Sequence, residues 1–174
     1  MKKAALRLLL AVGFSFVGSA VFGATVDISS WAGLNAYWTS ASTGDVLNID
    51  NDIAFGADLG TTYGWSDLTI DGNGNILNGN SQKGFVLNND KHITFQAISF
   101  NNFLAVSGGI VNGEGGALKV APISSAVFSG NINFIYNTAL NKGGAIMSSY
   151  SAVNFSNALV NFTSNTAQSN SYGN

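Results

Sequence analysis

The stretch GGALKVAPISSAVFSGNINFIYNTALNKGGAI, residues 115–146, decides the fold. It opens with Gly-Gly-Ala-Leu at Gly115 and closes with Gly-Gly-Ala-Ile at Gly143, 28 residues later. The motif Phe-x-x-Asn occurs inside it at Phe134 and recurs at Phe162, again 28 residues later. Two different motifs share one period, so the period measures a structural unit. Periods of about 20–50 residues are typical of solenoids, in which each unit buries its apolar face against its neighbours.

The residues of these two motifs are the candidate functional positions of the chain. We expect each Phe to point inward and stack on the next, each Asn to occupy a left-handed corner and pair its amide with the Asn of the neighbouring unit, and each Gly-Gly to form a corner closed to other residues. Two interpretations stay open: the motifs only build the units, or their exposed edges also take part in adhesion. The positions are Phe128, Asn131, Phe134, Asn137, Phe162, Asn165, Gly115, Gly116, Ala117, Leu118, Gly143, Gly144, Ala145 and Ile146.

The composition indicates many short strands and turns. Charged residues are only 9% of the 174 residues, whereas Gly and Asn number 21 and 22. Gly and Asn adopt the positive φ that turns require, and helical surfaces usually carry more charge. A hydrophobic content of 46% argues against disorder. Without Cys, disulfides and thiol catalysis are excluded.

The first 23 residues are predicted to be a signal peptide. A basic start, an apolar run too short to span a bilayer comfortably and a segment of small residues follow in that order. Cleavage after Gly23, with Val21 two positions before it, is preferred to cleavage after Ala20. The remaining chain has four Lys, nine carboxylates and no Arg, a net charge of −5. We therefore expect no nucleic-acid or anionic-lipid partner.

Residues 24–45 are predicted to form an N-terminal cap. Residues 25–28 read as a strand, and Ser29 or Ser30 as the N-cap of a short helix that ends near Thr43. Covering the open end of a solenoid is the expected role; an ordinary core helix is the alternative. The apolar face of this helix would consist of Trp31, Leu34 and Trp38.

Residues 46–174 are predicted to be the coils of a parallel β-helix, an all-β solenoid, with three short strands in each unit and insertions at corners, above all over residues 107–116. Third strands are expected at residues 85–87, 117–118 and 145–146. A first inward ladder would comprise Ile49, Ile70, Phe95, Phe128 and Phe155. A second inward ladder, on the next face, would comprise Phe55, Leu77, Phe100, Phe134 and Phe162.

Two family resemblances rest on these segments. Residues 30–55, with LTIDGNGNILNG at residues 68–79, resemble the first coils of right-handed parallel β-helices of the pectin-lyase-like superfamily. The paired GGAL and GGAI with FSGN, FIYN and FTSN, over residues 115–165, resemble the repeats of polymorphic outer-membrane proteins of the chlamydial type, which are autotransporter adhesins. The resemblance implies a signal peptide, a right-handed β-helical passenger at the cell surface and a C-terminal β-barrel. The sequence departs from that plan after Asn165, where no barrel follows, so we expect a fragment whose β-helix is incomplete at its C-terminus.

The sequence contains no recognisable catalytic or metal-binding pattern. Polysaccharide lyases of the β-helix class commonly need a basic Arg or Lys beside an acidic calcium site, and hydrolases need clustered carboxylates. Asp50 and Asp52 lie two apart in the first unit and read as solvated turn residues. Residues 71–75 imitate the start of an EF-hand loop but lack its Gly and its final Glu, so we expect a turn. We predict no enzyme activity, no metal site and no cofactor.

Four further polar residues read as structural. His92 is the only His, which excludes two-His metal sites, and no Ser-His-Asp set has a recognisable spacing, so we expect a surface residue beside Lys91. Glu114 has no partner in sequence and reads as a corner residue. Asn154 and Asn161 match the glycosylation pattern, which we interpret as coincidental because they fall in expected strands.

The sequence therefore predicts a secreted or surface-displayed β-helical passenger, an adhesin-like protein of the bacterial outer surface that binds a host-cell or cell-surface ligand. The outer membrane would be reached only through the missing C-terminal barrel. One alternative is a protein that binds or degrades polysaccharide. The other is a truncated fragment with no function of its own, whose last strand edge favours self-association.

Overall fold

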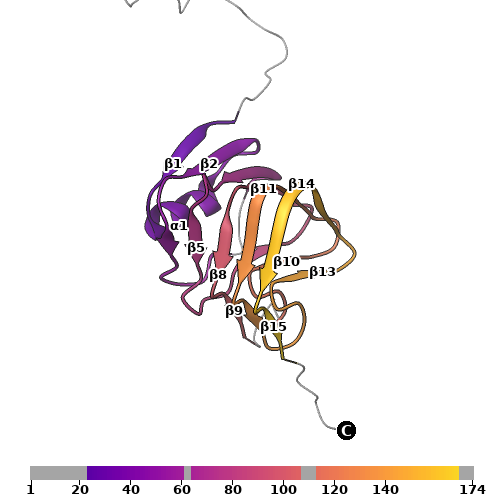
Figure 1. Cartoon of the computed structure of the whole chain (residues 1–174). Coiled ribbons are helices and arrows are strands. Elements are labelled where there is room, and N and C mark those ends of the chain that lie inside the picture. Colours follow the sequence, from indigo (N-terminus) through magenta and orange to yellow (C-terminus); the bar gives the residue numbers. More distant parts are fainter. Residues whose placement is uncertain (1–22, 61–63, 107–112, 169–174) are drawn as a thin grey trace, which may run out of the picture.

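The structure is a computed structural model that describes residues 23–60, 64–106 and 113–168. The expected signal peptide up to residue 22, and residues 107–112 of the expected corner insertion, lie outside these residues. The described chain is mostly β-strand in parallel sheets with one short helix, so the all-β prediction is confirmed. Figure 1 shows that the strands follow one another through the molecule largely in the order of the sequence, from β1 and α1 to β14 and β15.

Three sheets contain the described strands, and every pairing within them is parallel. The largest sheet has two rows that merge in its two longest strands. The first row is β1 (Thr25–Ile28), β2 (Asp45–Ile49), β4 (Asp67–Asp71) and β7 (His92–Gln96); the second is β3 (Ile53–Ala54), β5 (Ile76–Asn78) and β8 (Ser99–Asn101); both continue into β11 (Ser125–Ile135) and β14 (Ala152–Thr163). The second sheet comprises β6 (Phe85–Leu87), β10 (Leu118–Val120) and β13 (Ile146–Ser148); the third comprises β9 (Leu104–Ala105), β12 (Thr138–Ala139) and β15 (Thr166–Ala167).

The first ladder lies in register from Ile70 to Phe128. Ile70 pairs with Phe95, and Phe95 with Phe128. The rings of Phe95 and Phe128 stack at 5.4 Å between centroids, and the ring of Phe155 stacks on that of Phe128 at 4.9 Å. These residues point inward because side chains alternate along a strand, and the exposed fractions of β7 alternate in the same way.

The first member of this ladder was predicted wrongly. Leu47, not Ile49, pairs with Ile70, while Ile49 pairs with Ile28 of β1. Both residues are buried. The error is two residues, and a slip of two keeps the same side chains inward, so the apolar pattern does not distinguish the two registers.

The second ladder lies in register from its second member onward, and its first member was also predicted wrongly. Leu77 pairs with Phe100, Phe100 with Phe134 and Phe134 with Phe162, and the three Phe rings stack at 5.0 Å. Ile53, not Phe55, pairs with Leu77.

Phe55 has a different role in the core. Its ring packs edge-on against the ring of Phe103 at 4.9 Å. The contact depends on Gly79, since a Cβ there would lie 2.5 Å from the ring of Phe103. The missing side chain at Gly79 thus lets the two rings approach.

The prediction placed the two ladders on separate faces, but both lie in one sheet. β11 runs without interruption past both Phe128 and Phe134. Its backbone bends at Gly130, whose φ is +71°, and the register against β14 shifts between Val127 and Ser129. β14 therefore contains one extra residue, a β-bulge that bends the strand without ending the pairing.

A third strand is present in each of the three predicted places, but only β6 has the predicted bounds, because β10 and β13 begin and end later than predicted. Leu118 of β10 pairs with Phe85 on one side and Ile146 on the other. The third sheet was not predicted. Its strands have two residues each, and Leu104, Thr138 and Thr166 carry no aromatic signal. Such short pairs cannot be recognised from alternation, which needs several residues.

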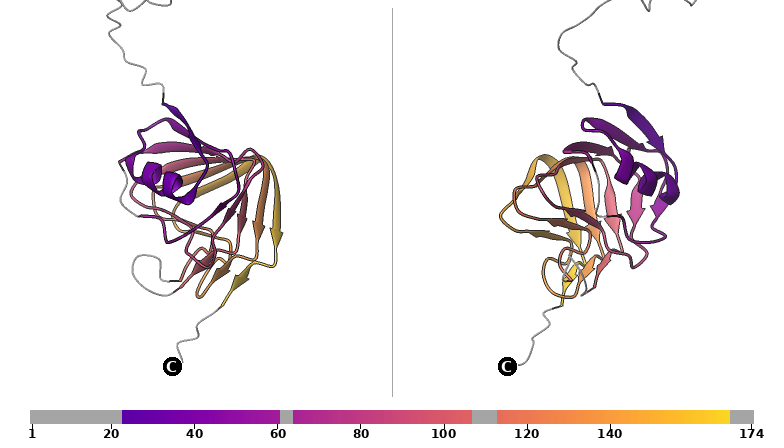
Figure 2. Two further views of the ribbon diagram at one scale, coloured as in Figure 1. Left: turned by 90° about the vertical axis from the view of Figure 1, so that its left-hand side faces the viewer. Right: turned by 180° about the vertical axis from the view of Figure 1, so that it is seen from behind.

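One helix, α1 (Trp31–Ser40), lies over the end of the core next to β1 and β2, as the views in Figure 2 show. Ser30 is its N-cap and accepts a hydrogen bond from the backbone N of Gly33 at 3.2 Å, as predicted. Leu34 and Trp38 are fully buried, and the ring of Trp38 contacts those of Trp65 and Phe85 at 5.0 and 5.2 Å. The helix ends at Ser40 rather than near Thr43, because a tight turn towards β2 follows it.

Candidate functional site

The asparagines of the repeat motif connect successive units. Asn137 is fully buried: its Oδ1 accepts from the backbone N of Phe103 at 3.0 Å, and its Nδ2 donates to the carbonyl of Phe100 at 2.9 Å and to Oδ1 of Asn165 at 2.9 Å. Oδ1 of Asn165 also accepts from the backbone N of Asn137 at 3.0 Å, and its Nδ2 donates to the carbonyl of Phe134 at 2.8 Å. The predicted amide pairing is confirmed. Each Asn completes the hydrogen bonds of the unit that precedes it.

The corner geometry differs from the prediction. The left-handed residues are Tyr136 and Ser164, with φ of +55° and +53°, each one position before the asparagine. The asparagine itself points into the core, where a buried amide needs partners, and the residue before it makes the turn. Asn131 is not at a corner at all: it lies exposed within β11, next to Gly130. The motif that starts at Phe128 therefore has a different structure from its two copies.

The Gly-Gly corners have two separate causes. Gly115 and Gly143 have φ of +66° and +63°, a region that favours glycine. Gly116 and Gly144 are required by proximity, because a Cβ at Gly116 would lie 2.0 Å from the carbonyl O of Gly144. The positive φ of the first glycine and the close backbone contact of the second confirm the prediction of a corner that no other pair of residues can form.

Glu114, which has no partner near it in the sequence, has two in the fold. Its carboxylate lies 3.0 Å from Nζ of Lys119 and 3.9 Å from Nζ of Lys142, and the backbones of Glu114 and Lys142 form a parallel bridge. The side chains of Glu114 and Lys119 are largely buried. Sequence reasoning missed these partners because they come from the next strand and the next unit.

A hollow of about 470 Å³ opens at the corner between β10 and β11, and we call it the corner hollow. The side chain of Ile123 lines it and is 68% exposed, although its φ is +61°. Next to it, Tyr150 has φ of +48° and is 93% exposed, and the backbone N of Ile123 donates to the carbonyl of Tyr150 at 3.1 Å. The lining residues are Asn88, Asn89, Ala121, Pro122 and Ile123.

These two corner residues are unfavourable for stability. A left-handed conformation costs an ordinary L-residue roughly 1–2 kcal/mol, and a β-branched residue there is an outlier. Neither Ile123 nor Tyr150 recovers that cost by burial. Strain together with exposure marks a position as a candidate for function.

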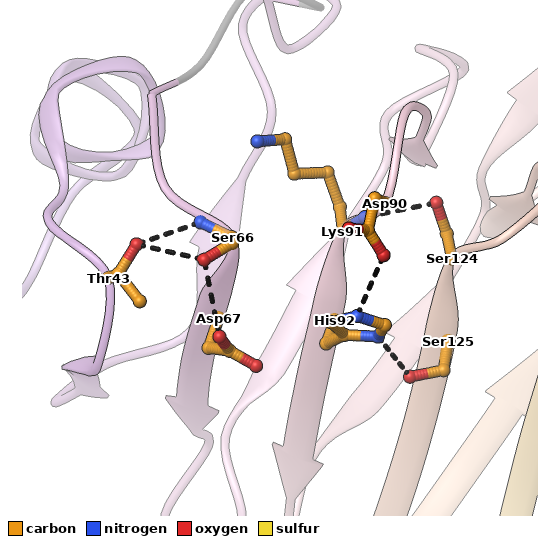
Figure 3. A network of polar contacts seen from close by, with 8 residues as sticks. All are labelled: Thr43, Ser66, Asp67, Asp90, Lys91, His92, Ser124 and Ser125. Carbon is orange, nitrogen blue, oxygen red and sulfur yellow. Dashed lines mark hydrogen bonds and ion pairs between the residues drawn. The ribbon is translucent and has the colours of Figure 1, made fainter.

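Beside the corner hollow, a polar network follows the start of the first row of strands (Figure 3). Nδ1 of His92 lies 2.7 Å from Oγ of Ser125, and Nε2 of His92 lies 3.1 Å from Oδ1 of Asp90. Ser125 and His92 are register partners on β11 and β7. Sequence reasoning missed this Ser-His-Asp set, and only an alignment of the two strands could have found it.

The backbone amides around Ser125 already have partners. The N of Ser125 donates to the carbonyl of Lys91 at 2.9 Å, the N of Lys91 to Oγ of Ser124 at 3.1 Å, and the N of His92 to the carbonyl of Ser66 at 2.7 Å. The side chain of Lys91 extends away from His92 in Figure 3, and its Nζ lies 6.0 Å from the ring centroid of Trp65. Acyl transfer needs donors directed at a developing oxyanion, and these amides are engaged elsewhere.

The remaining acidic candidates lie on turns. Asp50 and Asp52 are exposed, and they accept from Nδ2 of Asn48 at 3.1 Å and from the backbone N of Ile76 at 2.8 Å. The backbone N of Asn73 donates to Oδ1 of Asp71 at 3.1 Å, which confirms the predicted turn. Within the described ranges, no three His, Asp or Glu residues gather closely enough to hold a metal ion.

The three sheets end on one edge, formed by β13, β14 and β15. Phe162 is 54% exposed there, whereas Phe100 and Phe134, its partners in the second ladder, are fully buried. A hollow of about 360 Å³ lies among the inward side chains of this edge, including Phe155 and Phe162. No charged residue follows Lys142 in the sequence.

No protein-family model matches the chain, and no curated protein or solved structure matches it significantly. Among the described residues, no helix is long and apolar enough to cross a membrane.

Proposed function

We propose that the chain is a right-handed parallel β-helix that is secreted and displayed at the bacterial surface, where it binds a ligand in the manner of an adhesin passenger. Parallel pairing of successive strands, in rows with inward Phe ladders, supports the solenoid. The helix at one end of the core supports a cap. The basic and apolar segments before Gly23 support export.

The corner hollow carries the binding part of the proposal. Ile123 and Tyr150 expose large apolar side chains from strained corners, and the neighbouring Asn89 and Pro122 complete a surface of mixed polarity. Binding sites combine apolar area with a few polar groups, and side chains that bind a partner are often retained at a cost in stability. We therefore assign ligand contact to the corner line of Ile123 and Tyr150, and a building role to the buried motif residues.

Action on a polysaccharide is the second candidate, and the Ser125–His92–Asp90 set beside the corner hollow is the observation that favours it. The engaged amides around Ser125 weigh against hydrolysis. Release of acid from acetylated pectin or another esterified polymer, abolished by Ser125→Ala, would move the function to this set.

The test of the main proposal is binding to cells. The labelled chain is added to cultured epithelial cells and to bacterial cells, and the bound fraction is measured against concentration. We expect saturable binding that falls at least about tenfold in the variant with Ile123→Asn and Tyr150→Ser, which loses two exposed apolar contacts. Val106→Asn is the matched control, because Val106 is exposed and does not line the corner hollow.

The single variant Ile123→Asn separates a binding role from a folding role. Asn tolerates the left-handed conformation, so Ile123→Asn should raise the free energy of unfolding by about 0.5–1 kcal/mol while binding is lost. Binding that is absent from both cell types, or that the double variant leaves unchanged, would exclude the corner line as the ligand surface.

A further inference from the structure

Asp45, the first residue of β2, is a buried carboxylate whose hydrogen-bond donors, among the described residues, are backbone amides. Only 7% of the surface of Asp45 is exposed. Its Oδ1 accepts from the backbone N of Ala24 at 2.7 Å, and its Oδ2 accepts from the backbone N of Ser42 at 2.8 Å. Among the described residues, no lysine lies within ion-pair distance of it. A buried carboxylate is costly unless a positive charge or several donors compensate it.

The nearest donor belongs to the residue that follows the preferred cleavage site. Ala24 is exposed, and β2 also holds its other side, because the backbone N of Val46 donates to the carbonyl of Ala24 at 2.8 Å. Before it, Gly23 passes so close to Gly44 that a Cβ at Gly23 would lie 1.8 Å from the carbonyl O of Gly44. The uncut fold thus requires glycine at the position where signal peptidase also requires a small residue.

We propose that the chain is cut between Gly23 and Ala24 and that the new α-ammonium group of Ala24 forms an ion pair with Asp45. Hydrolysis adds the OH of water to the carbonyl carbon of Gly23 and a hydrogen to the nitrogen of Ala24. The released carboxylic acid then gives up its proton and the amine takes one up. The amide that donates to Asp45 in the uncut chain becomes a cation at the same place.

This proposal rests on export, the first part of the proposed function, and extends it to a structural role for the cut. It also decides between the two cleavage sites that the sequence leaves open. A cut after Ala20 would place the charge on Val21, three residues before Ala24, and would leave Asp45 with neutral donors only. Hydrogen bonds between charged partners are roughly twice as strong as neutral ones, so the cut at Gly23 stabilises the N-terminal end.

The experiment compares purified chains that begin at Ala24 and end at Asn174. They are released from an N-terminal fusion without extra residues, and one half is acetylated at the α-amino group. Acetylation restores a neutral amide and so reproduces the uncut chain locally. Equilibrium unfolding is measured for both forms, each with Asp45 and with Asp45→Asn, as a double-mutant cycle.

We expect acetylation to lower the folding equilibrium constant at least about tenfold when Asp45 is present and to change it little in Asp45→Asn. Asp67→Asn, at the start of the neighbouring β4, is the matched control and should leave the effect of acetylation intact. An equal effect of acetylation with and without Asp45 would refute the ion pair.

Two further measurements keep the proposal decidable. If Asp45→Asn does not fold, a chain that starts at Gly23 replaces it, because one extra residue moves the ammonium away from Asp45; equal stability of the two chains would refute the proposal. N-terminal sequencing of the exported protein must give Ala24, and Val21 would refute the site. Purified chains report the ion pair without any secretion, so its failure is distinguishable from a failure of surface display.

Discussion

Phe128, Phe134 and Phe162 share one motif but differ in burial. Phe128 and Phe134 are fully buried between rings on both sides, whereas Phe162 has a ring neighbour of its ladder on one side only. Truncation of a buried aromatic removes its transfer free energy and leaves a cavity. The position of a Phe in the stack, rather than its motif, therefore sets its contribution.

We predict that Phe128→Ala or Phe134→Ala lowers the free energy of unfolding by about 3–5 kcal/mol. Phe162→Ala should cost clearly less, because 54% of that residue is already exposed. Urea denaturation of the three variants, followed by tryptophan fluorescence, measures the difference. Equal losses at all three positions would mean that Phe162 is covered in solution.

Asn137 and Asn131 offer the same comparison for the polar half of the motif. Asn137→Ala leaves the buried N–H of Phe103 and the carbonyl of Phe100 without their partner, and each such loss costs about 1–3 kcal/mol. We predict a total loss of about 2–4 kcal/mol in unfolding free energy for Asn137→Ala. The exposed Asn131→Ala is the control and should stay within about 0.5 kcal/mol. A similar loss in both would contradict the corner assignment.

At the scale of the strand and its corner, the Gly-Gly pairs set the distance between units. Gly116→Ala would push its Cβ against the carbonyl of Gly144, so β10 and β13 would have to separate. We predict a loss of about 3 kcal/mol or more in unfolding free energy for Gly116→Ala. Gly64→Ala is the control, because nothing lies within 4 Å of a Cβ there, and thermal unfolding of both variants tests the contrast. Comparable melting temperatures would show that the corner can relax.

The elements that could be predicted from sequence are those with a repeated aromatic residue. Phe95, Phe100, Phe128 and Phe134 mark both ladders because each aromatic signal recurs in the neighbouring unit. The register of the first unit was missed by two residues, since its Leu and Ile residues offer two equivalent inward sets. The corner hollow was not predictable, because it depends on where exposed corners meet, and the partner of Asp45 depends on a contact 21 residues away.

At the scale of the whole molecule, the two ends of the sheets differ in their protection. The edge at β1 is short, carries Asp27 and lies beside α1. The edge at β14 is 12 residues long and has no charged residue. Natural proteins protect open edges with charges, short strands or covering elements, so we expect copies of the chain to associate through β14.

We predict that the chain from Ala24 onward associates as its concentration rises and that Leu159→Lys, on the exposed edge, shifts it towards the monomer. The lysine side chains of two associating copies would face each other across their β14 edges, and their positive charges would repel. Val106→Lys, an exposed position outside β14, is the control and should leave association unchanged. Sedimentation velocity over a concentration series measures both, and a chain that stays monomeric throughout would disprove the open edge.

The backward reach of the asparagines gives folding a direction. The N–H of Phe103 donates to Oδ1 of Asn137, which lies 34 residues later in the sequence. The N–H of Asn137 donates in the same way to Oδ1 of Asn165 in the following unit. If the chain folds from its N-terminus onward, each new unit supplies the hydrogen-bond acceptors that the preceding unit lacks. The donors at its own corner stay unsatisfied until the next unit has folded. Because repeat proteins gain stability through neighbour contacts, the most recent unit is always the loosest, and the growing end alone is exposed to proteases and mispairing.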